Sequence, residues 1–160
     1  MPDLKSFFHE LVYYQVELWE ALDARLQEEC GLPLTWFEIM DLLERLPAAR
    51  VQDIAAAFSI SVGGTSKVVD KLEAGGYCRR RPNPVDRRSS LIELTDEGRA
   101  GLERAAAVFD RELASRIGSV VSERELDQTL ETLTALREAG RAPSGDRGAV
   151  RAVPGRQCDA

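Results

Sequence analysis

At 160 residues, 44% of them hydrophobic, the chain is long enough for one compact domain with a core and too short for two enzyme domains. Its formal net charge is −6, and no apolar run approaches the ~18 residues that a membrane span needs, so we expect a cytoplasmic protein with no membrane partner. The three cysteines, Cys30, Cys78 and Cys158, lie far apart and suggest neither a disulfide framework nor a paired-cysteine metal site.

Charge is distributed unevenly along the chain. Residues 1–60 carry 4 Lys and Arg against 11 Asp and Glu, whereas residues 61–90 carry 7 against 3. A surface that binds a polyanion would produce this local excess of cations, and so would a solvated charged loop. Charge alone does not distinguish the two.

Two helices are predicted in the first part of the chain. Apolar residues at three- and four-residue steps predict a long amphipathic helix over about 3–29, ending at Gly31. A second helix follows over about 35–46. Thr35 and Glu38 have the spacing of a capping box, in which each side chain satisfies a free backbone donor, and are expected to start that helix.

A helix-turn-helix and a hairpin are predicted next. The apolar pattern gives a short helix over 51–58, then a three-residue turn, then a helix from about Ser61 to Ala74. Two glycines end that helix and lead into two extended stretches, "YCRRR" and "SSLIEL". These are joined by "PNPVD", so we expect a β-hairpin with a proline-stiffened tip.

The last predicted elements are two helices and a tail. Thr95 is expected to cap a helix that runs to about Ile117. Ser122 and Glu125 form a second predicted capping box, at the start of a helix with leucines on one stripe. Residues 139–160 are rich in Gly, Pro and Arg without periodicity and are predicted to be disordered.

This order of elements predicts a mainly α protein that contains a winged helix-turn-helix. In such a unit one helix braces the next, whose outer face enters the DNA major groove, while the hairpin reaches the backbone or the minor groove. A narrow minor groove attracts arginine, which accounts for the five arginines of the hairpin. The predicted outer face of the recognition helix consists of Gly63, Gly64, Lys67, Asp70 and Lys71.

The sequence resembles the MarR family of winged-helix transcription regulators. The resemblance is carried by "LTWFEIMDLLERL", by "VQDIAAAFSISVGGTSKVVDKLEAGGYCRRR" and above all by "NPVDRRSSLIELTDEG". It implies a homodimeric repressor that binds double-stranded DNA at a palindromic operator and is released by a small aromatic or phenolic effector. The implied organisation is a single domain over 1–138, with dimerisation helices at about 3–30 and 96–138 and a DNA-binding region at about 35–95.

Carried over residue by residue, the resemblance assigns the DNA contacts. At the start of the recognition helix the predicted contacts are Ser61, Gly63, Gly64, Thr65, Ser66 and Lys67. At the wing tip they are Asp86, Arg87 and Arg88. Three further cations beside these two regions complete the predicted set: Lys71, Arg79 and Arg81. Glycines stand where many such helices have longer polar side chains, so sequence readout is expected to use backbone, water and DNA shape as well. Asp86 is either a turn residue or the carboxylate that orients a neighbouring guanidinium.

Aromatic side chains in the first two helices suggest an effector site. Tyr14, Gln15, Trp19, Trp36 and Met40 would form an apolar cleft with few polar groups, for which we expect a small aromatic anion. The alternative is that these side chains are ordinary core or dimer-interface residues.

The sequence leaves two alternative functions open and does not favour a third. A winged-helix module could dock its arginines on an acidic protein, and Cys78 could sense oxidants, although no histidine is nearby in the sequence. An enzyme is not expected, because the chain has one histidine and lacks a nucleophile motif, a phosphate loop and a metal-ligand pair. No cofactor or metal is expected either.

Overall fold

The chain divides into two units, Met1–Ile117 and Gly118–Ala160, and the computed structural model describes residues 3–141 of them. The predicted disordered tail and Cys158 lie outside the described residues, except that positions 139–141 continue the last helix to Arg141. Among the described residues, none of the helices combines the length and the hydrophobicity that crossing a bilayer requires. In chain order the elements are α1 (Leu4–Cys30), α2 (Leu34–Arg45), β1 (Ala49–Arg50), α3 (Val51–Phe58), α4 (Val62–Ala74), β2 (Cys78–Pro82), β3 (Ser90–Leu94), α5 (Asp96–Leu113), the π-helical turn η1 (Ala114–Gly118) and α6 (Glu123–Arg141).

The start of α2 is stabilised from α1. The Asp23 carboxylate accepts a hydrogen bond from the backbone N–H of Leu34 at 2.7 Å. Pro33 is the N-cap residue and has no side-chain donor or acceptor, while Thr35 already lies inside the helix. The capping box predicted for Thr35 and Glu38 is therefore wrong, and the Glu38 side chain is left without a capping role.

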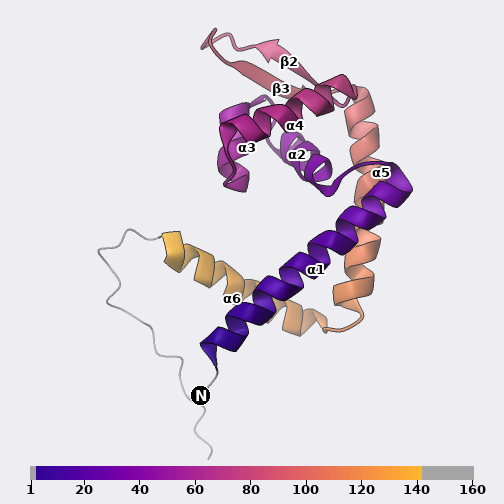
Figure 1. Cartoon of the computed structure of the whole chain (residues 1–160), viewed down its shortest axis with the longest axis vertical. Coiled ribbons are helices and arrows are strands. Elements are labelled where there is room, and N and C mark those ends of the chain that lie inside the picture. The colour runs from indigo at the N-terminus through magenta and orange to yellow at the C-terminus, as the bar shows by residue number, and fades with distance from the viewer. Residues whose placement is uncertain (1–2, 142–160) are drawn as a thin grey trace, which may run out of the picture. The chain divides into compact units, whose positions relative to one another are not determined.

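The three strands form one antiparallel sheet with β3 in the centre, in the order β1-β3-β2. In the predicted hairpin, Cys78 pairs with Leu94 and Pro82 pairs with Ser90. The apolar pattern does not predict β1, because two residues are too few to show alternation. Figure 1 shows the hairpin of β2 and β3 beyond α4, at the end of the first unit that is farthest from the amino terminus of α1.

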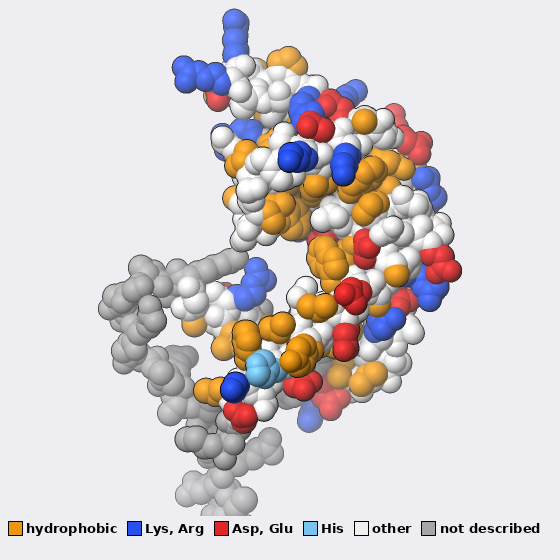
Figure 2. Space-filling model, in the orientation of Figure 1, with side chains coloured by type: hydrophobic (Ala, Val, Ile, Leu, Met, Phe, Trp, Pro, Cys, Tyr) orange, Lys and Arg blue, Asp and Glu red, His pale blue; other side chains and the backbone are white. Residues whose placement is uncertain are grey.

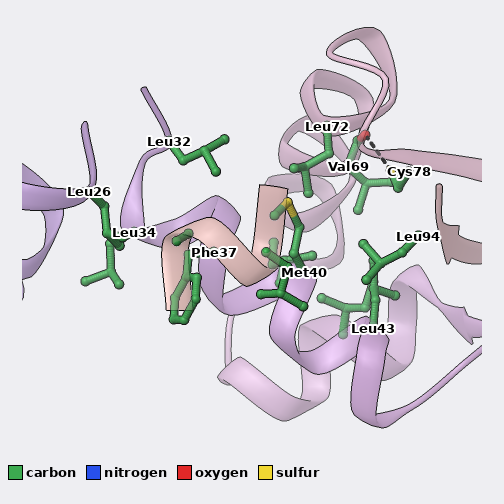
Figure 3. Packing of buried hydrophobic residues seen from close by; sticks show 14 of the residues in the cluster. Leu26, Leu32, Leu34, Phe37, Met40, Leu43, Val69, Leu72, Cys78 and Leu94 are labelled. Carbon is green, nitrogen blue, oxygen red and sulfur yellow. Dashed lines mark hydrogen bonds between the residues drawn. The ribbon is translucent and has the colours of Figure 1, made fainter. Parts of the chain in front are cut away.

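The core of the first unit is built from the helices α1 to α5 and the sheet, and Ile54 of α3 is fully buried in it. Figure 3 shows leucines of α1, α2, α4 and β3 packed with the α2 side chains Phe37 and Met40. Met40 has no exposed surface, so this predicted cleft residue belongs to the core instead. Its position follows from the helical period, which places it on the same inward face of α2 as Leu43.

Thr95 fastens the wing to α5. Its hydroxyl donates to the Gly76 carbonyl at 2.5 Å and accepts from the N–H of Gly98 at 2.9 Å, which confirms the predicted cap. A Cβ on Gly98 would lie 2.0 Å from the Tyr77 carbonyl oxygen, so the backbones approach too closely for any other residue. The Leu-Thr-x-x-Gly sequence is therefore the joint between the hairpin and α5.

In the second unit, α6 begins with the predicted capping box. The Glu125 carboxylate accepts from the Ser122 N–H at 2.8 Å, and the Ser122 hydroxyl accepts from the Glu125 N–H at 3.4 Å. The helix has an apolar stripe that no described residue of its own unit covers fully, since Leu130 and Leu136 are 53% and 52% exposed.

Candidate nucleic-acid interface

The helix-turn-helix consists of α3, a short turn and α4. Ser59 turns the chain in the left-handed region with φ 55°, and Ser61 then caps α4 by accepting from the Gly64 N–H at 3.1 Å. The two helices pack against each other. This is the arrangement in which the second helix of the pair is presented to the major groove.

One face of α4 is open to solvent at its amino-terminal end. Its exposed residues are Ser61, Val62, Gly63, Gly64, Lys67, Asp70 and Lys71, with Ser66 half-buried. Thr65 was expected among them, and this is wrong: Thr65 is fully buried, and its hydroxyl donates to the Ser61 carbonyl at 3.0 Å. The helical period puts Thr65 on the same inward face as Val69 and Leu72, so it cannot face the groove.

Two arginines of β2 are engaged by a single carboxylate of β3. Arg79 lies 3.6 Å from Glu93, and Arg81 forms a closer ion pair with the same residue. Arg79 also lines a cleft with Glu44 and Arg99, on the side of the hairpin that faces α2 and α5. In this structure both guanidinium groups pair within the hairpin while remaining largely exposed, and their DNA contacts stay a prediction.

Arg80, which the sequence did not single out, connects the wing to the recognition helix. Its guanidinium pairs with Asp70 at 2.5 Å and with Glu73, and its N–H donates to Glu73 at 3.0 Å. Asp70 was predicted to lie on the groove-facing side of α4, and its carboxylate pairs with Arg80 where the wing meets α4. The signal available in the sequence was strand alternation, which places Arg80 on the opposite side of β2 from Arg79 and Arg81.

The wing tip is held in shape by hydrogen bonds of its own polar residues. Asn83 accepts from the Val85 N–H at 3.0 Å, and Asp86 accepts from the Arg88 N–H at 3.0 Å. Of the two roles open for Asp86, turn residue or partner of a guanidinium group, this hydrogen bond is that of a turn residue. Within residues 3–141, no ion pair involves Arg87 or Arg88. Figure 2 shows Lys and Arg side chains standing clear of the surface at this tip.

A cleft of about 230 Å³ lies where α3, α4 and the wing meet. It is lined by Arg50, Arg80 and Arg88, together with Ser66. Arg50 was not predicted to lie here. Its guanidinium donates two hydrogen bonds to Asp53, at 2.8 and 3.0 Å, and its backbone N–H donates a third at 2.9 Å; this interaction lowers the pKa of the Asp53 carboxyl. Arg50 and Arg80 both have acidic partners, whereas Arg88 forms no ion pair with any described residue.

A second, apolar cleft of about 220 Å³ lies between α1, α2 and α5. Three of the five predicted effector residues, Tyr14, Gln15 and Trp19, line it. The other lining residues are Leu11, Leu18, Leu22, Leu34, Glu38 and Phe109. Burial and the nearby Asp41 raise the pKa of the Glu38 carboxyl.

Trp36 and Met40 do not join this cleft. Trp36 packs edge-on against Tyr77, with ring centroids 6.0 Å apart, and Met40 is in the core. Two residues that line this cleft were not predicted from the sequence to do so. Phe109 lies on α5, and Glu38 lies on α2, where it was predicted to act in a capping box. The aromatic composition of α1 and α2 could not show which of their side chains face α5.

Comparison with known proteins identifies the family. The model of the MarR family matches residues 32–90. The HTH-type transcriptional regulator MhqR of Bacillus subtilis is 31% identical over 103 residues, covering 64% of this chain and 70% of MhqR. The chain belongs to the MarR family. It is a transcriptional regulator and not an enzyme, and its mainly helical fold with a β-wing is that of the MarR winged-helix structures.

Solved MarR-family structures resemble this chain over most of its length. Sco3205 from Streptomyces coelicolor, solved in complex with DNA, aligns with TM-score 0.78 and 24% identity over 91% of this chain and 92% of its own. The repressor CouR, bound to a 23-mer DNA duplex, aligns with TM-score 0.74 and 27% identity over 80% and 89%. CouR from Rhodococcus jostii RHA1 bound to p-coumaroyl-CoA aligns with TM-score 0.70 and 24% identity over 79% and 87%.

Cys78 of this MarR-family regulator is a poor oxidant sensor. The side chain is buried, its thiol lies 3.8 Å from the Val69 carbonyl oxygen, and burial together with Glu73 raises its pKa to about 11 (Figure 3). We expect a variant that keeps only this cysteine, Cys30→Ser with Cys158→Ser, to resist iodoacetamide at pH 8 when folded and to react when unfolded in urea, because the thiolate is the nucleophile. Rapid labelling of the folded protein, followed by mass spectrometry, would contradict this.

Proposed function

We propose that the chain is a homodimeric repressor that binds a palindromic operator through α4 and the wing and is released by a small aromatic ligand. The residues proposed to contact DNA are Ser61, Gly63, Gly64, Ser66, Lys67, Lys71, Arg87 and Arg88. Gly63 has no side chain, so the backbone of α4 can approach a phosphate closely there, and no other part of the described chain lies within 4 Å of the position a Cβ would take.

The proposal rests on which Lys and Arg side chains of residues 61–90 form ion pairs and which do not. Residues 61–90 contain seven Lys and Arg, and three of them, Arg79, Arg80 and Arg81, are held by acidic residues. Within the described chain, the other four make no ion pair: Lys67, Lys71, Arg87 and Arg88. These four lie on the exposed side of α4 and at the wing tip, the two places where a winged helix meets DNA. Unpaired cations at those positions favour phosphate binding.

The apolar surface of α1 supports the dimer. Phe7, Phe8 and Leu11, near its amino terminus, are 51%, 59% and 42% exposed, and Figure 2 shows hydrophobic side chains along this half of the helix. The stripe on α6 is exposed within its own unit as well. Contiguous apolar surface of this extent is typical of a dimer interface.

We expect sedimentation equilibrium to give twice the chain mass, and Phe7→Glu combined with Leu11→Glu to shift the protein to monomers, because a carboxylate in an apolar interface is strongly unfavourable. Val85→Glu is the control, since it adds a carboxylate of the same kind at the wing tip, where Val85 is 93% exposed. A monomeric wild type, or a double variant that remains dimeric, would contradict the proposed interface.

The ligand response would act through the spacing of the two recognition helices. A ligand in the α1–α2–α5 cleft that prefers one spacing by about 1.4 kcal/mol changes DNA affinity tenfold. Support comes from CouR, a repressor of this fold that has been solved both with DNA and with p-coumaroyl-CoA.

A reporter experiment tests the regulatory function. Genomic fragments retained by the purified protein are placed before a reporter gene and transcribed in vitro with and without the protein. We expect the protein to lower transcription from these fragments and an aromatic ligand that binds the cleft to restore it. Transcription that is unchanged or increased by the protein would contradict the repressor.

A further inference from the structure

Glu38 differs from the other half-buried carboxylates in having no partner. Within residues 3–141, six of the seven half-buried acids form an ion pair or a hydrogen bond: Asp23, Asp41, Asp53, Glu73, Glu93 and Glu112. No hydrogen bond or ion pair joins Glu38 to any other described residue. A half-buried charge without a partner reduces stability, and a carboxyl group in such an environment within a cleft is a candidate for binding a ligand that supplies the partner.

The walls of the cleft around Glu38 are suited to a cation. Three of the lining residues, Tyr14, Trp19 and Phe109, have aromatic side chains, and none of the lining residues is Lys, Arg or His. The adjoining hollow on α1 shares Gln15 and Trp19 and adds a second carboxylate, Glu20. Aromatic faces attract ammonium groups through the negative potential of the ring, and a carboxylate beside them strengthens that attraction.

The same walls do not suit the aromatic anion expected from the sequence. A ligand carboxylate about 4 Å from Glu38 would be repelled by about 4 kcal/mol at the effective dielectric of a protein surface, and no cationic side chain lines the cleft to offset this. The surrounding helices reinforce the effect, because residues 1–60 carry 4 cationic against 11 acidic side chains and so attract cations to this part of the molecule.

We infer that the cleft between α1, α2 and α5 binds a small aromatic amine in its protonated form, with the ammonium group at Glu38 and the ring among Tyr14, Trp19 and Phe109. The inference rests on the proposed ligand response and assigns the charge class of its effector. Binding would give Glu38 a charged partner, where five of the other six half-buried acids have an ion pair and Asp23 has hydrogen bonds to amide groups. The ring would fill the apolar part of the cleft.

Three probes of matched shape test the charge preference: 1-naphthylmethylamine, 1-naphthylmethanol and 1-naphthylacetate. Their affinities for the full chain are measured by isothermal titration calorimetry at neutral pH. We expect the amine to bind at least about tenfold more tightly than the alcohol and the acetate to bind most weakly. Acetate binding equal to or tighter than amine binding, or no binding of any probe, would overturn the inference.

Glu38→Gln identifies the residue responsible. It keeps the size and polarity of the side chain, so we expect the amine to lose about tenfold in affinity while the alcohol is unaffected. Glu17→Gln is the matched control: it removes the same charge from α1, at an exposed position that does not line the cleft, and should change neither affinity. A preference for the amine that survives Glu38→Gln would overturn the assignment. Operator binding, measured without any probe, reports separately on the proposed function, so the two can fail independently.

Discussion

Replacing Arg87 and Arg88 together with alanine is expected to lower operator affinity by about 100-fold or more without changing the fold. Both residues project from the wing tip without an ion pair in the described chain, so both guanidinium groups are available to DNA. Each contact to phosphate or base is worth about 1–3 kcal/mol. Fluorescence anisotropy with labelled operator gives the affinity, and circular dichroism gives the melting temperature.

Arg79→Ala is the matched control for the wing. It removes one positive charge from the same hairpin, but from a residue that pairs with Glu93 and faces α2 and α5. We expect operator affinity to change by less than about threefold, as for a remote charge at moderate ionic strength. If the double variant binds as tightly as wild type, or Arg79→Ala weakens binding equally, the wing does not dock through its tip.

Gly98→Ala is expected to lower the free energy of unfolding by about 3 kcal/mol or more, which corresponds to a fall in melting temperature of about 6–12 °C. The new methyl group would stand 2.0 Å from the Tyr77 carbonyl oxygen, so the hairpin or α5 must move. That movement also strains the Thr95 cap, whose hydroxyl accepts from the Gly98 N–H.

The control for this substitution is Gly63→Ala. A Cβ on Gly63 meets nothing within 4 Å among the described residues, so the free energy of unfolding should change by no more than an ordinary surface substitution does, about ±0.5 kcal/mol, which is about 2 °C or less in melting temperature. Thermal denaturation of both variants gives the comparison directly. An unchanged melting temperature for Gly98→Ala would mean that the wing and α5 are not tightly joined at this point.

The order of the elements could be predicted from the sequence because local signals determine it. The apolar periodicity of α1, the turn before α4 and the caps at Thr95 and Ser122 all depend on residues within a few positions of one another. Each of these predictions agrees with the structure. The resemblance to the MarR family rests on the same local motifs.

The failures of prediction involve partners that are distant in the sequence. The cap of α2 comes from Asp23 on another helix, and the strand arginine Arg80 binds Asp70 and Glu73 of α4. A single sequence shows charge and spacing but not which element lies opposite. For the same reason Trp36, which faces Tyr77, could not be separated from the aromatic residues of the cleft.

The position of Thr65 is a different kind of error. Its place inside the recognition helix was carried over from the resemblance, while its burial was available from the period that it shares with Val69 and Leu72. The helical face, rather than the residue type, decides which side chains can reach a base.

Selection of bound duplexes from a random-sequence pool tests the central claim most directly, followed by affinity measurements on the selected site. A homodimer that presents α4 and the wing twice should enrich a two-fold symmetric site with half-site centres about one helical turn apart, bound in the nanomolar range or tighter, with affinity that falls steeply as salt rises. Inserting about 5 base pairs between the half-sites should rotate them to opposite faces of the duplex and abolish specific binding. Recovery of no common sequence, or tight binding that survives the insertion, would contradict the account.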